Sequence, residues 1–232
     1  MKKYLKFSVF GLTTILLLVN NAFSQSNPVK SKPVIIGYVA GFRGLIDTDK
    51  IAAQKLTHIN YAFVNVKGNN AFLGNLKTDT VNFRKLNLLK HKNPDLKIFI
   101  SIGGWAWSEN FSDAVLTDSS RAEFAKSSVD IIRKYNLDGV DIDWEYPARP
   151  GEEGNVYRPE DKQNFTLMFQ AIRKELDVLQ KETGHKKLLS TAVGGFTDFL
   201  NTSEMGKAQQ YLDYVNLMTY HLYTGGGTAS YH

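Results

Sequence analysis

The residues with the most chemical potential lie together in 138–145, Asp-Gly-Val-Asp-Ile-Asp-Trp-Glu. Side chains alternate between the two faces of a strand, so Asp141, Asp143 and Glu145 share one face, with successive residues about 6–7 Å apart. Carboxylates this close cannot all ionise freely, and at least one pKa should rise. A carboxyl group that stays protonated near neutral pH suits a general acid. Glu145, at the carboxyl end of the strand, is therefore the candidate acid.

Two other interpretations of these carboxylates stay open on residue chemistry alone. Hard divalent cations bind carboxylate oxygens, so the same spacing would suit a metal site. A solvated, acidic strand end without function is the other interpretation. The apolar residues between the acids, Val140, Ile142 and Trp144, argue against solvation because they indicate a strand covered on its other face. Acid catalysis is favoured over metal binding.

The elements that must position these residues follow from hydrophobic periodicity. Runs rich in β-branched and aromatic residues predict six strands, at 34–39, 57–64, 97–102, 138–144, 187–193 and 213–220. Stretches with helical spacing lie between them, most clearly at 79–91, 118–135 and 159–182. Asp118 or Ser119 is the expected cap of the second helix, and Gly184 ends the third. This alternation predicts an α/β fold with a parallel sheet covered by helices.

Composition places the chain among soluble globular proteins. It has 232 residues, of which 43% are hydrophobic and 12% aromatic, enough for a sizeable core. The net charge is +5, but Lys2, Lys3 and Lys6 supply three of those charges. The remaining body is nearly neutral, which argues against a nucleic-acid partner. The absence of cysteine excludes disulfides, a cysteine nucleophile and cysteine-based zinc sites.

The N-terminus predicts export from the cell. Lysines precede an apolar run, Phe7 to Val19, and small residues at Ala22 and Ser24 suit cleavage before Gln25. The run is short for a membrane anchor, which needs about 20 apolar residues. We therefore expect a signal peptide over 1–24, a linker over 25–33 and one domain over 34–232. The product would be secreted, extracellular or periplasmic, with no membrane partner after cleavage.

Residues 138–145, followed by Tyr146 and Pro147, resemble the catalytic signature of glycoside hydrolase family 18, the chitinases and related endo-N-acetylglucosaminidases. Residues 36–38 (IGY), 101–105 (SIGGW) and 216–220 (NLMTY) resemble the family's first, third and sixth strands, in the same order. The resemblance implies a (β/α)8 TIM barrel that hydrolyses β-1,4-linked N-acetylglucosamine in chitin or its oligosaccharides. It also implies that neither a metal nor another cofactor takes part.

The resemblance further implies a role for each catalytic residue. The family uses substrate-assisted chemistry with retention, so Glu145 would protonate the glycosidic oxygen while the substrate's own N-acetyl carbonyl attacks the anomeric carbon. Asp143 would hold the N-acetyl N–H, and Asp141 would share a proton with Asp143. Tyr220 would position the N-acetyl oxygen for attack.

Several substrate-binding residues are implied in the same way. Tyr38 and Ser101 match family positions whose hydroxyls bond the inner aspartate, here Asp141. Trp144 is the weakest candidate for stacking on a sugar, because strand alternation turns it away from the acids. The other implied substrate-binding residues are Phe63, Gly104, Trp105, Tyr146, Met218 and His221.

Two features depart from the family pattern. His221 stands where the family usually has aspartate after the tyrosine, and a histidine brings a positive charge below about pH 6.5, so we expect weaker catalysis. The chain also stops soon after the sixth strand, so about six of eight βα units are expected. A chain of this length is predicted to be inactive and prone to aggregate.

Two alternative functions remain. One is an endo-β-N-acetylglucosaminidase that acts on N-glycans. The other is an inactive relative that binds chitin oligosaccharides, and the presence of Glu145 argues against it.

Overall fold

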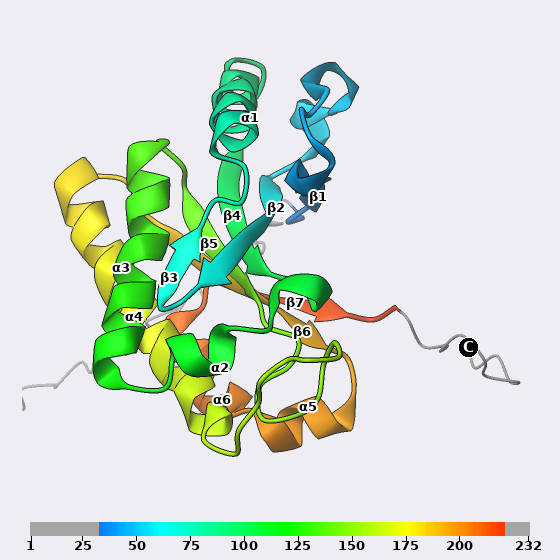
Figure 1. The fold of residues 1–232 in the computed structure, drawn as a ribbon. Coiled ribbons are helices and arrows are strands. Elements are labelled where there is room, and N and C mark those ends of the chain that lie inside the picture. Colours follow the sequence, from blue (N-terminus) through cyan, green and yellow to red (C-terminus); the bar gives the residue numbers. More distant parts are fainter. Residues whose placement is uncertain (1–32, 221–232) are drawn as a thin grey trace, which may run out of the picture. The chain divides into compact units, whose positions relative to one another are not determined.

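The computed structural model describes residues 33–220 (Figure 1). The predicted signal peptide, most of the predicted linker, and His221 lie outside these residues. The six expected strands are present, and they form one parallel sheet in the order β1-β2-β4-β5-β6-β7. Their bounds are Ile36–Ala40 (β1), His58–Lys67 (β2), Lys97–Gly103 (β4), Gly139–Asp143 (β5), Leu188–Gly194 (β6) and Tyr214–Met218 (β7).

The strand order follows the chain order, and every neighbouring pair is parallel. Strands that add on one side in sequence, with helical crossovers between them, build a (β/α) barrel wall. Within residues 33–220, β1 and β7 stand at the two ends of this order and do not pair with each other. The fold is therefore an incomplete TIM barrel, as the sequence predicts.

One strand was not predicted from the sequence. β3 (Asn70–Phe72) pairs antiparallel with the end of β2, across a turn at Gly68, whose φ is +55°. With only three residues, β3 is too short to show a hydrophobic period. Its backbone is tied to a helix, because Ala71 N donates to Ser127 Oγ at 2.9 Å.

The helices lie outside the sheet. They are α1 (Leu76–Leu88), α2 (Phe111–Ala114), α3 (Asp118–Lys134), α4 (Asp161–Thr183), α5 (Thr197–Thr202) and α6 (Met205–Ala208). α4 ends at Gly184 in the left-handed conformation, as predicted. The helix expected at 79–91 begins three residues earlier and ends as a 3₁₀ turn over Leu89–His91.

The predicted cap of α3 is wrong. Thr117, one residue before the predicted positions, accepts a hydrogen bond from Ser120 N at 3.1 Å. The Ser120 hydroxyl in turn accepts from Thr117 N at 3.0 Å, which completes a capping box. Ser120 takes the place that Glu or Gln usually fills in this motif, so the sequence signature was missed.

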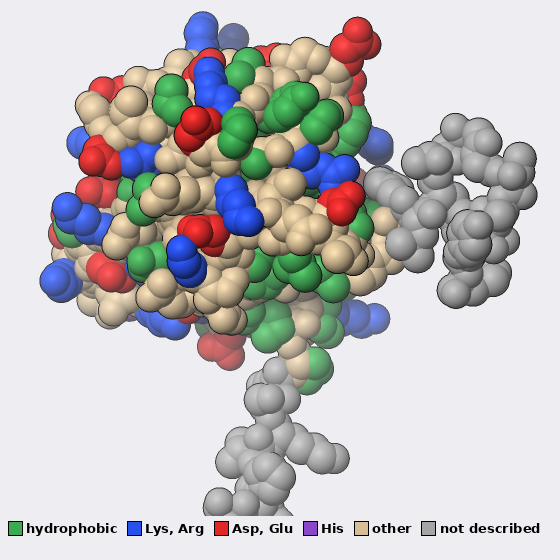
Figure 2. Space-filling model, turned by 90° about the horizontal axis from the view of Figure 1, so that it is seen from below, with side chains coloured by type: hydrophobic (Ala, Val, Ile, Leu, Met, Phe, Trp, Pro, Cys, Tyr) green, Lys and Arg blue, Asp and Glu red, His purple; other side chains and the backbone are tan. Residues whose placement is uncertain are grey.

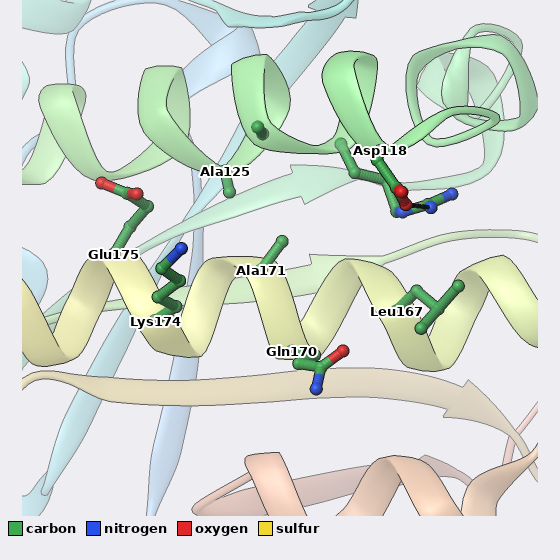
Figure 3. A pocket seen from close by; sticks show the side chains of 9 residues that line it. Asp118, Ala125, Leu167, Gln170, Ala171, Lys174 and Glu175 are labelled. Carbon is green, nitrogen blue, oxygen red and sulfur yellow. Dashed lines mark hydrogen bonds and ion pairs between the residues drawn. The ribbon is translucent and has the colours of Figure 1, made fainter.

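The core lies between the sheet and the helices α3 and α4, which run side by side (Figures 1 and 3). The buried face of α4 contains all the residues that the periodicity predicts, and Phe169 in addition; the predicted residues are Phe165, Met168, Ile172, Leu176 and Leu179. Val140 and Ile142 of β5 are fully buried and belong to the same core. On the surface seen in Figure 2, acidic and basic side chains are interspersed, and neither sign dominates. None of the helices within residues 33–220 combines the length and apolar character that crossing a membrane requires.

Candidate active site

The inner face of the sheet carries a polar cluster centred on Asp141 of β5. Asp141 is fully buried, and its register partners are Ser101 on β4 and Ser190 on β6. Ser101 Oγ donates to Asp141 Oδ2 at 2.8 Å, and Tyr38 OH from β1 donates to the same oxygen at 2.9 Å. These are the two hydroxyls that the family resemblance implied.

Two further donors reach Asp141, and sequence reasoning missed both. Ser190 Oγ donates to Asp141 Oδ1 at 2.5 Å. Asn216 Nδ2, from β7, donates to the same oxygen at 3.3 Å and to Tyr38 OH at 3.4 Å. Burial raises the pKa of Asp141, and the hydrogen bonds from Ser190, Ser101 and Tyr38 oppose that rise because they stabilise the charged form.

Asp143 lies one step further along the same face and has a different environment. It is buried, and its Oδ1 has no hydrogen-bond partner within the part of the chain that the structure describes. Burial raises its pKa well above the ordinary range, and the negative charges of Glu145 and then Asp141 raise it further. Asp143 is therefore the member of the carboxylate row that favours the protonated form.

Glu145 follows the end of β5, and its backbone is held by Ser108, in the segment after β4, and by Asn155. Glu145 N donates to Ser108 Oγ at 2.9 Å, while the Ser108 hydroxyl donates to Gly104 O at 2.9 Å. Asn155 Nδ2 donates to Glu145 O at 3.2 Å. The side chain of Glu145 is half-buried. Neither Ser108 nor Asn155 belongs to the signature residues, and only the fold reveals their contribution.

Gly103 and Gly104 allow β4 to approach the end of β5 closely. Both have positive φ, +106° and +87°. A Cβ on Gly103 would lie 2.2 Å from Asp143 O, and one on Gly104 would lie 2.8 Å from the Phe63 ring. Gly104 N donates to Asp143 O at 2.7 Å. These glycines are needed because any side chain would push Asp143 or Phe63 away.

A cavity of about 260 Å³ opens at Asp143, and four predicted site residues line it: Tyr38, Phe63, Asp143 and Tyr220. Tyr220 lies two residues beyond the end of β7. Burial raises its pKa, followed by the charges of Asp143, Glu145 and Asp141, so its hydroxyl lies within the field of all three carboxylates. Phe42 and Ala192 also line the cavity and were not predicted.

A group of aromatic side chains lies beside Glu145. Trp105 is 47% exposed and meets Tyr146 edge-to-face, with ring centroids 6.3 Å apart. Tyr146 in turn meets Phe196 at 5.3 Å. Burial, the Glu145 charge and a hydrogen bond to Glu145 all raise the pKa of the Tyr146 hydroxyl. Half-exposed rings beside an acid are suited to stack on the apolar faces of sugar rings.

The remaining candidates are placed as follows. Met218 is half-buried at the end of β7, where it pairs in register with Gly194. Trp144 is only 1% exposed and stacks on Phe111 at 5.2 Å and 14°, so it faces the helices, as strand alternation predicts. His221 lies outside the described residues. Within residues 33–220 no group of three His, Cys, Asp or Glu side chains is arranged to hold a metal ion.

A larger hollow, of about 510 Å³, lies between α3 and α4 (Figure 3). Ala125 and Ala171 face each other across it. Its one buried charge, Arg121, is already bonded to Val115 O at 2.7 Å and to Asn164 Oδ1 at 2.9 Å. It contains none of the predicted site residues, and its location outside the sheet separates it from the carboxyl ends of the strands. The site described above is therefore the better candidate.

Comparisons with known proteins show which family the chain resembles. The profile of the family described as "Glycosyl hydrolases family 18" matches residues 34–231. Chitinase A1 of Niallia circulans is 35% identical over an alignment of 271 residues, gaps included, that covers 94% of this chain and 38% of that protein.

Two solved structures are similar in fold and sequence. Chitinase ChiA74 from Bacillus thuringiensis has a TM-score of 0.80 and 33% identity, over 87% of this chain and 42% of that one. A family 18 N-acetylglucosaminidase from Paenibacillus barengoltzii has a TM-score of 0.73 and 39% identity, over 81% of this chain and 53% of that one. The chain thus spans about two fifths of Chitinase A1 and of ChiA74, and about half of the third relative.

Proposed function

Because the chain belongs to glycosyl hydrolase family 18, we propose that it carries the catalytic carboxylates of a chitinase that cleaves β-1,4 bonds between N-acetylglucosamine units with retention. The placement of Asp143 supports this best. A buried carboxyl with an open oxygen lies between Asp141 and Glu145, on a cavity that Tyr220 also lines. The relatives' names as chitinases agree with this substrate class.

In the first step, Glu145 acts as the general acid. It gives its proton to the glycosidic oxygen while the bond from that oxygen to the anomeric carbon breaks. The carbonyl oxygen of the substrate's own N-acetyl group bonds to the same carbon and forms an oxazolinium ion. The leaving sugar departs as a neutral alcohol, and Glu145 is left as a carboxylate.

The neighbouring residues hold the N-acetyl group for this attack. Asp143 accepts a hydrogen bond from the N–H of the N-acetyl group. Tyr220 donates a hydrogen bond to the carbonyl oxygen of the same group, which fixes the angle at which that oxygen attacks. In the second step Glu145 removes a proton from a water that attacks the anomeric carbon. The oxazolinium ring opens, the N-acetyl group is restored, and the configuration is retained because two inversions have occurred.

The Glu145→Gln variant tests this function. An amide cannot donate the proton, so hydrolysis of a fluorogenic chitobioside should fall by about 10²–10⁴-fold, the usual range for a lost general acid. Affinity for chitin oligosaccharides, measured by calorimetry, should persist because the amide keeps the shape of the side chain. Glu175→Gln, in the hollow between α3 and α4, is the matched control and should leave turnover unchanged.

The outcomes separate the three functions considered. An unsubstituted chain that is monomeric, unfolds cooperatively and binds oligosaccharides without turning them over would favour a binding protein. Release of glycans from an N-glycoprotein, with no action on chitin oligosaccharides, would favour an endo-N-acetylglucosaminidase. Equal turnover by the Glu145→Gln variant and the unsubstituted chain would remove Glu145 from the mechanism.

We also propose that the protein is exported by residues 1–24. The lysines and the apolar run before Gln25 support this. Expression in the original cell followed by N-terminal sequencing should find a secreted product that begins at Gln25. Retention of the whole chain inside the cell would contradict it.

A further inference from the structure

The carboxylate of Asp141 accepts as many hydrogen bonds as it has lone pairs. Tyr38 and Ser101 donate to Oδ2 at 2.9 and 2.8 Å, and Ser190 and Asn216 donate to Oδ1 at 2.5 and 3.3 Å. An ionised carboxylate offers about four lone-pair sites, two on each oxygen. The four donors therefore occupy these sites, and the side chain of Asn60 on β2 further stabilises the charged form of Asp141.

The parallel register explains why the arrangement is so complete. Ser101 and Ser190 are the direct register partners of Asp141, one on each neighbouring strand, so both point to the same face at the same level. Tyr38 and Asn216 come from β1 and β7, the two ends of the strand order, and meet each other at 3.4 Å. The donors thus converge on Asp141 from four strands.

This arrangement has a consequence for Asp143. A protonated Asp143 needs a hydrogen-bond acceptor. Asp141, the preceding carboxylate on the same face of β5, already accepts four hydrogen bonds. Asp143 Oδ1 has no partner within residues 33–220, and Glu145 raises the pKa of Asp143 more than Asp141 does. Both observations agree with an Asp143 that is not paired with Asp141.

We propose that Ser190 and Asn216 are positioning residues, which fill Oδ1 of Asp141 so that it stays ionised, the proton of the aspartate pair stays on Asp143, and Asp143 is directed toward Glu145 and the substrate. This inference rests on the proposed function, since it concerns the same reaction. Neither residue touches the substrate. They act through Asp141, and the shorter bond makes Ser190 the stronger of the two.

A measurement on the full chain without substrate tests the proposal. Aspartate labelled with ¹³C at the carboxyl group reports protonation by NMR, and Asp141→Asn and Asp143→Asn variants assign the two signals. Over the pH range in which the pair holds one proton, Asp143 should show the protonated shift and Asp141 the ionised shift. Site-resolved signals are needed because coupled groups share their macroscopic titration.

Ser190→Ala should redistribute this proton. It removes a hydrogen bond to a charged group and frees a lone pair on Asp141, so the titration of Asp141 should move upward by about one pH unit. In the one-proton range the Asp143 signal should move toward the ionised shift. Asn216→Leu should act in the same direction with a smaller shift, because its bond is longer, and it decides the matter if Ser190→Ala does not fold.

Two controls separate positioning from a structural role. Ser190→Thr keeps the hydroxyl and should restore the unsubstituted titration. Thr191→Val removes a buried hydroxyl from the next residue of β6, one that donates to Ile142 O at 2.8 Å rather than to Asp141, and should leave both aspartate signals in place. Unchanged signals in Ser190→Ala and Asn216→Leu, or a proton resident on Asp141 in the unsubstituted chain, would overturn the proposal.

Kinetics provide the second readout. With a chitobioside substrate, Ser190→Ala should lower kcat about tenfold, the equivalent of one pKa unit, with KM within about twofold, and should displace the acidic limb of the pH–rate profile. An unsubstituted chain that is monomeric and unfolds cooperatively but shows no turnover would contradict the proposed function alone. The NMR comparison needs no turnover and would still decide where the proton lies.

Discussion

Asp143 illustrates at the scale of one residue how a position with a proposed catalytic role opposes stability. Its carboxyl is buried between two others, and one oxygen lacks a partner within the described residues. Its native pKa is raised by burial, then by Glu145 and Asp141. Folding therefore favours the protonated form, and ionising Asp143 at higher pH destabilises the folded state.

Asp143→Asn should consequently stabilise the chain, and the effect should depend on pH. Below about pH 4, the ordinary pKa of aspartate, the carboxyl is protonated in both folded and unfolded chains, so the variant gains nothing. As pH rises toward the native pKa the gain should grow, by about 1.4 kcal/mol for each pH unit between the two pKa values. Urea unfolding between pH 4 and pH 8 measures it.

The exposed Asp95, whose side chain makes no hydrogen bond or ion pair in the described structure, supplies the control. Asp95→Asn should change the free energy of unfolding by less than about 0.5 kcal/mol at every pH. A flat difference between Asp143→Asn and the unsubstituted chain over this range would show that Asp143 is not held protonated.

Sequence reasoning placed the row of carboxylates on one face of β5 but identified only some of the residues that hydrogen-bond to it. The alternation of a strand was enough to place Asp141 and Asp143 on one face. Ser190 and Asn216 were missed because an aspartate's neighbours depend on register between strands far apart in sequence, and register is not written in either strand. Ser190 could have been found by aligning strand ends, since it lies directly opposite Asp141.

At the scale of the element, the tryptophans that follow β4 and β5 lie in different environments. Trp144 is 1% exposed and packs on Phe111 and Phe165, whereas Trp105 is 47% exposed beside Tyr146. Trp144→Ala should lower the free energy of unfolding by about 3–5 kcal/mol, the range for a large aromatic residue lost from a core. Trp105→Ala should change it by less than about 1 kcal/mol and should instead weaken binding of chitin oligosaccharides.

Chemical denaturation and calorimetry on the two variants measure these effects together. Ligand affinity of Trp144→Ala is measured under conditions where the variant remains folded. If Trp105→Ala proved the more destabilising of the two, the assignment of these faces would be reversed.

Helix α3 offers a second prediction at this scale, because its start was the misplaced element boundary. Thr117 accepts from Ser120 N and closes a capping box. Thr117→Ala should destabilise the chain by about 1 kcal/mol, the usual value for a lost cap. The exposed Ser119, which the sequence offered as the alternative cap, should tolerate Ser119→Ala within about 0.5 kcal/mol. Thermal unfolding compares them, and equal losses would mean that Thr117 does not cap α3.

The elements that sequence predicted well are the long, strongly periodic ones. The stripe of α4 is regular over 23 residues and its glycine stop is unambiguous. The elements that were missed or misplaced depend on tertiary contacts. β3 is a three-residue strand held by β2 and Ser127, and the cap of α3 relies on a serine where the usual motif has a longer side chain.

At the scale of the whole molecule, the site depends on the entire strand order. Tyr38 lies on the first strand, Asn216 on the last, and Asp141 accepts hydrogen bonds from both. A polar cluster built from β5 and four other strands explains why no fragment of the sheet would form the site. The sequence predicted this architecture through the family resemblance, because the closure of a sheet into a barrel wall has no local signal.

The same strand order leaves apolar surface at one end. Val215 and Leu217, on the outer face of β7, are 45% and 56% exposed, and β7 pairs only with β6 within residues 33–220. An apolar strand at an unpaired edge is a site of self-association. The 232-residue chain, produced alone, should therefore form larger species as its concentration rises.

Val215→Lys combined with Leu217→Lys should suppress this association, because charges on an edge strand oppose pairing with another chain. Leu88→Lys is the matched control: Leu88 is 55% exposed at the end of α1, where no strand edge is available. Size-exclusion chromatography with light scattering over a hundredfold concentration range distinguishes the variants. The double variant should stay monomeric, and Leu88→Lys should associate like the unsubstituted chain. Two results would show that the β7 face does not drive association. One is an unsubstituted chain that stays monomeric over the whole concentration range, and the other is a Leu88→Lys variant whose association is reduced as much as that of the double variant.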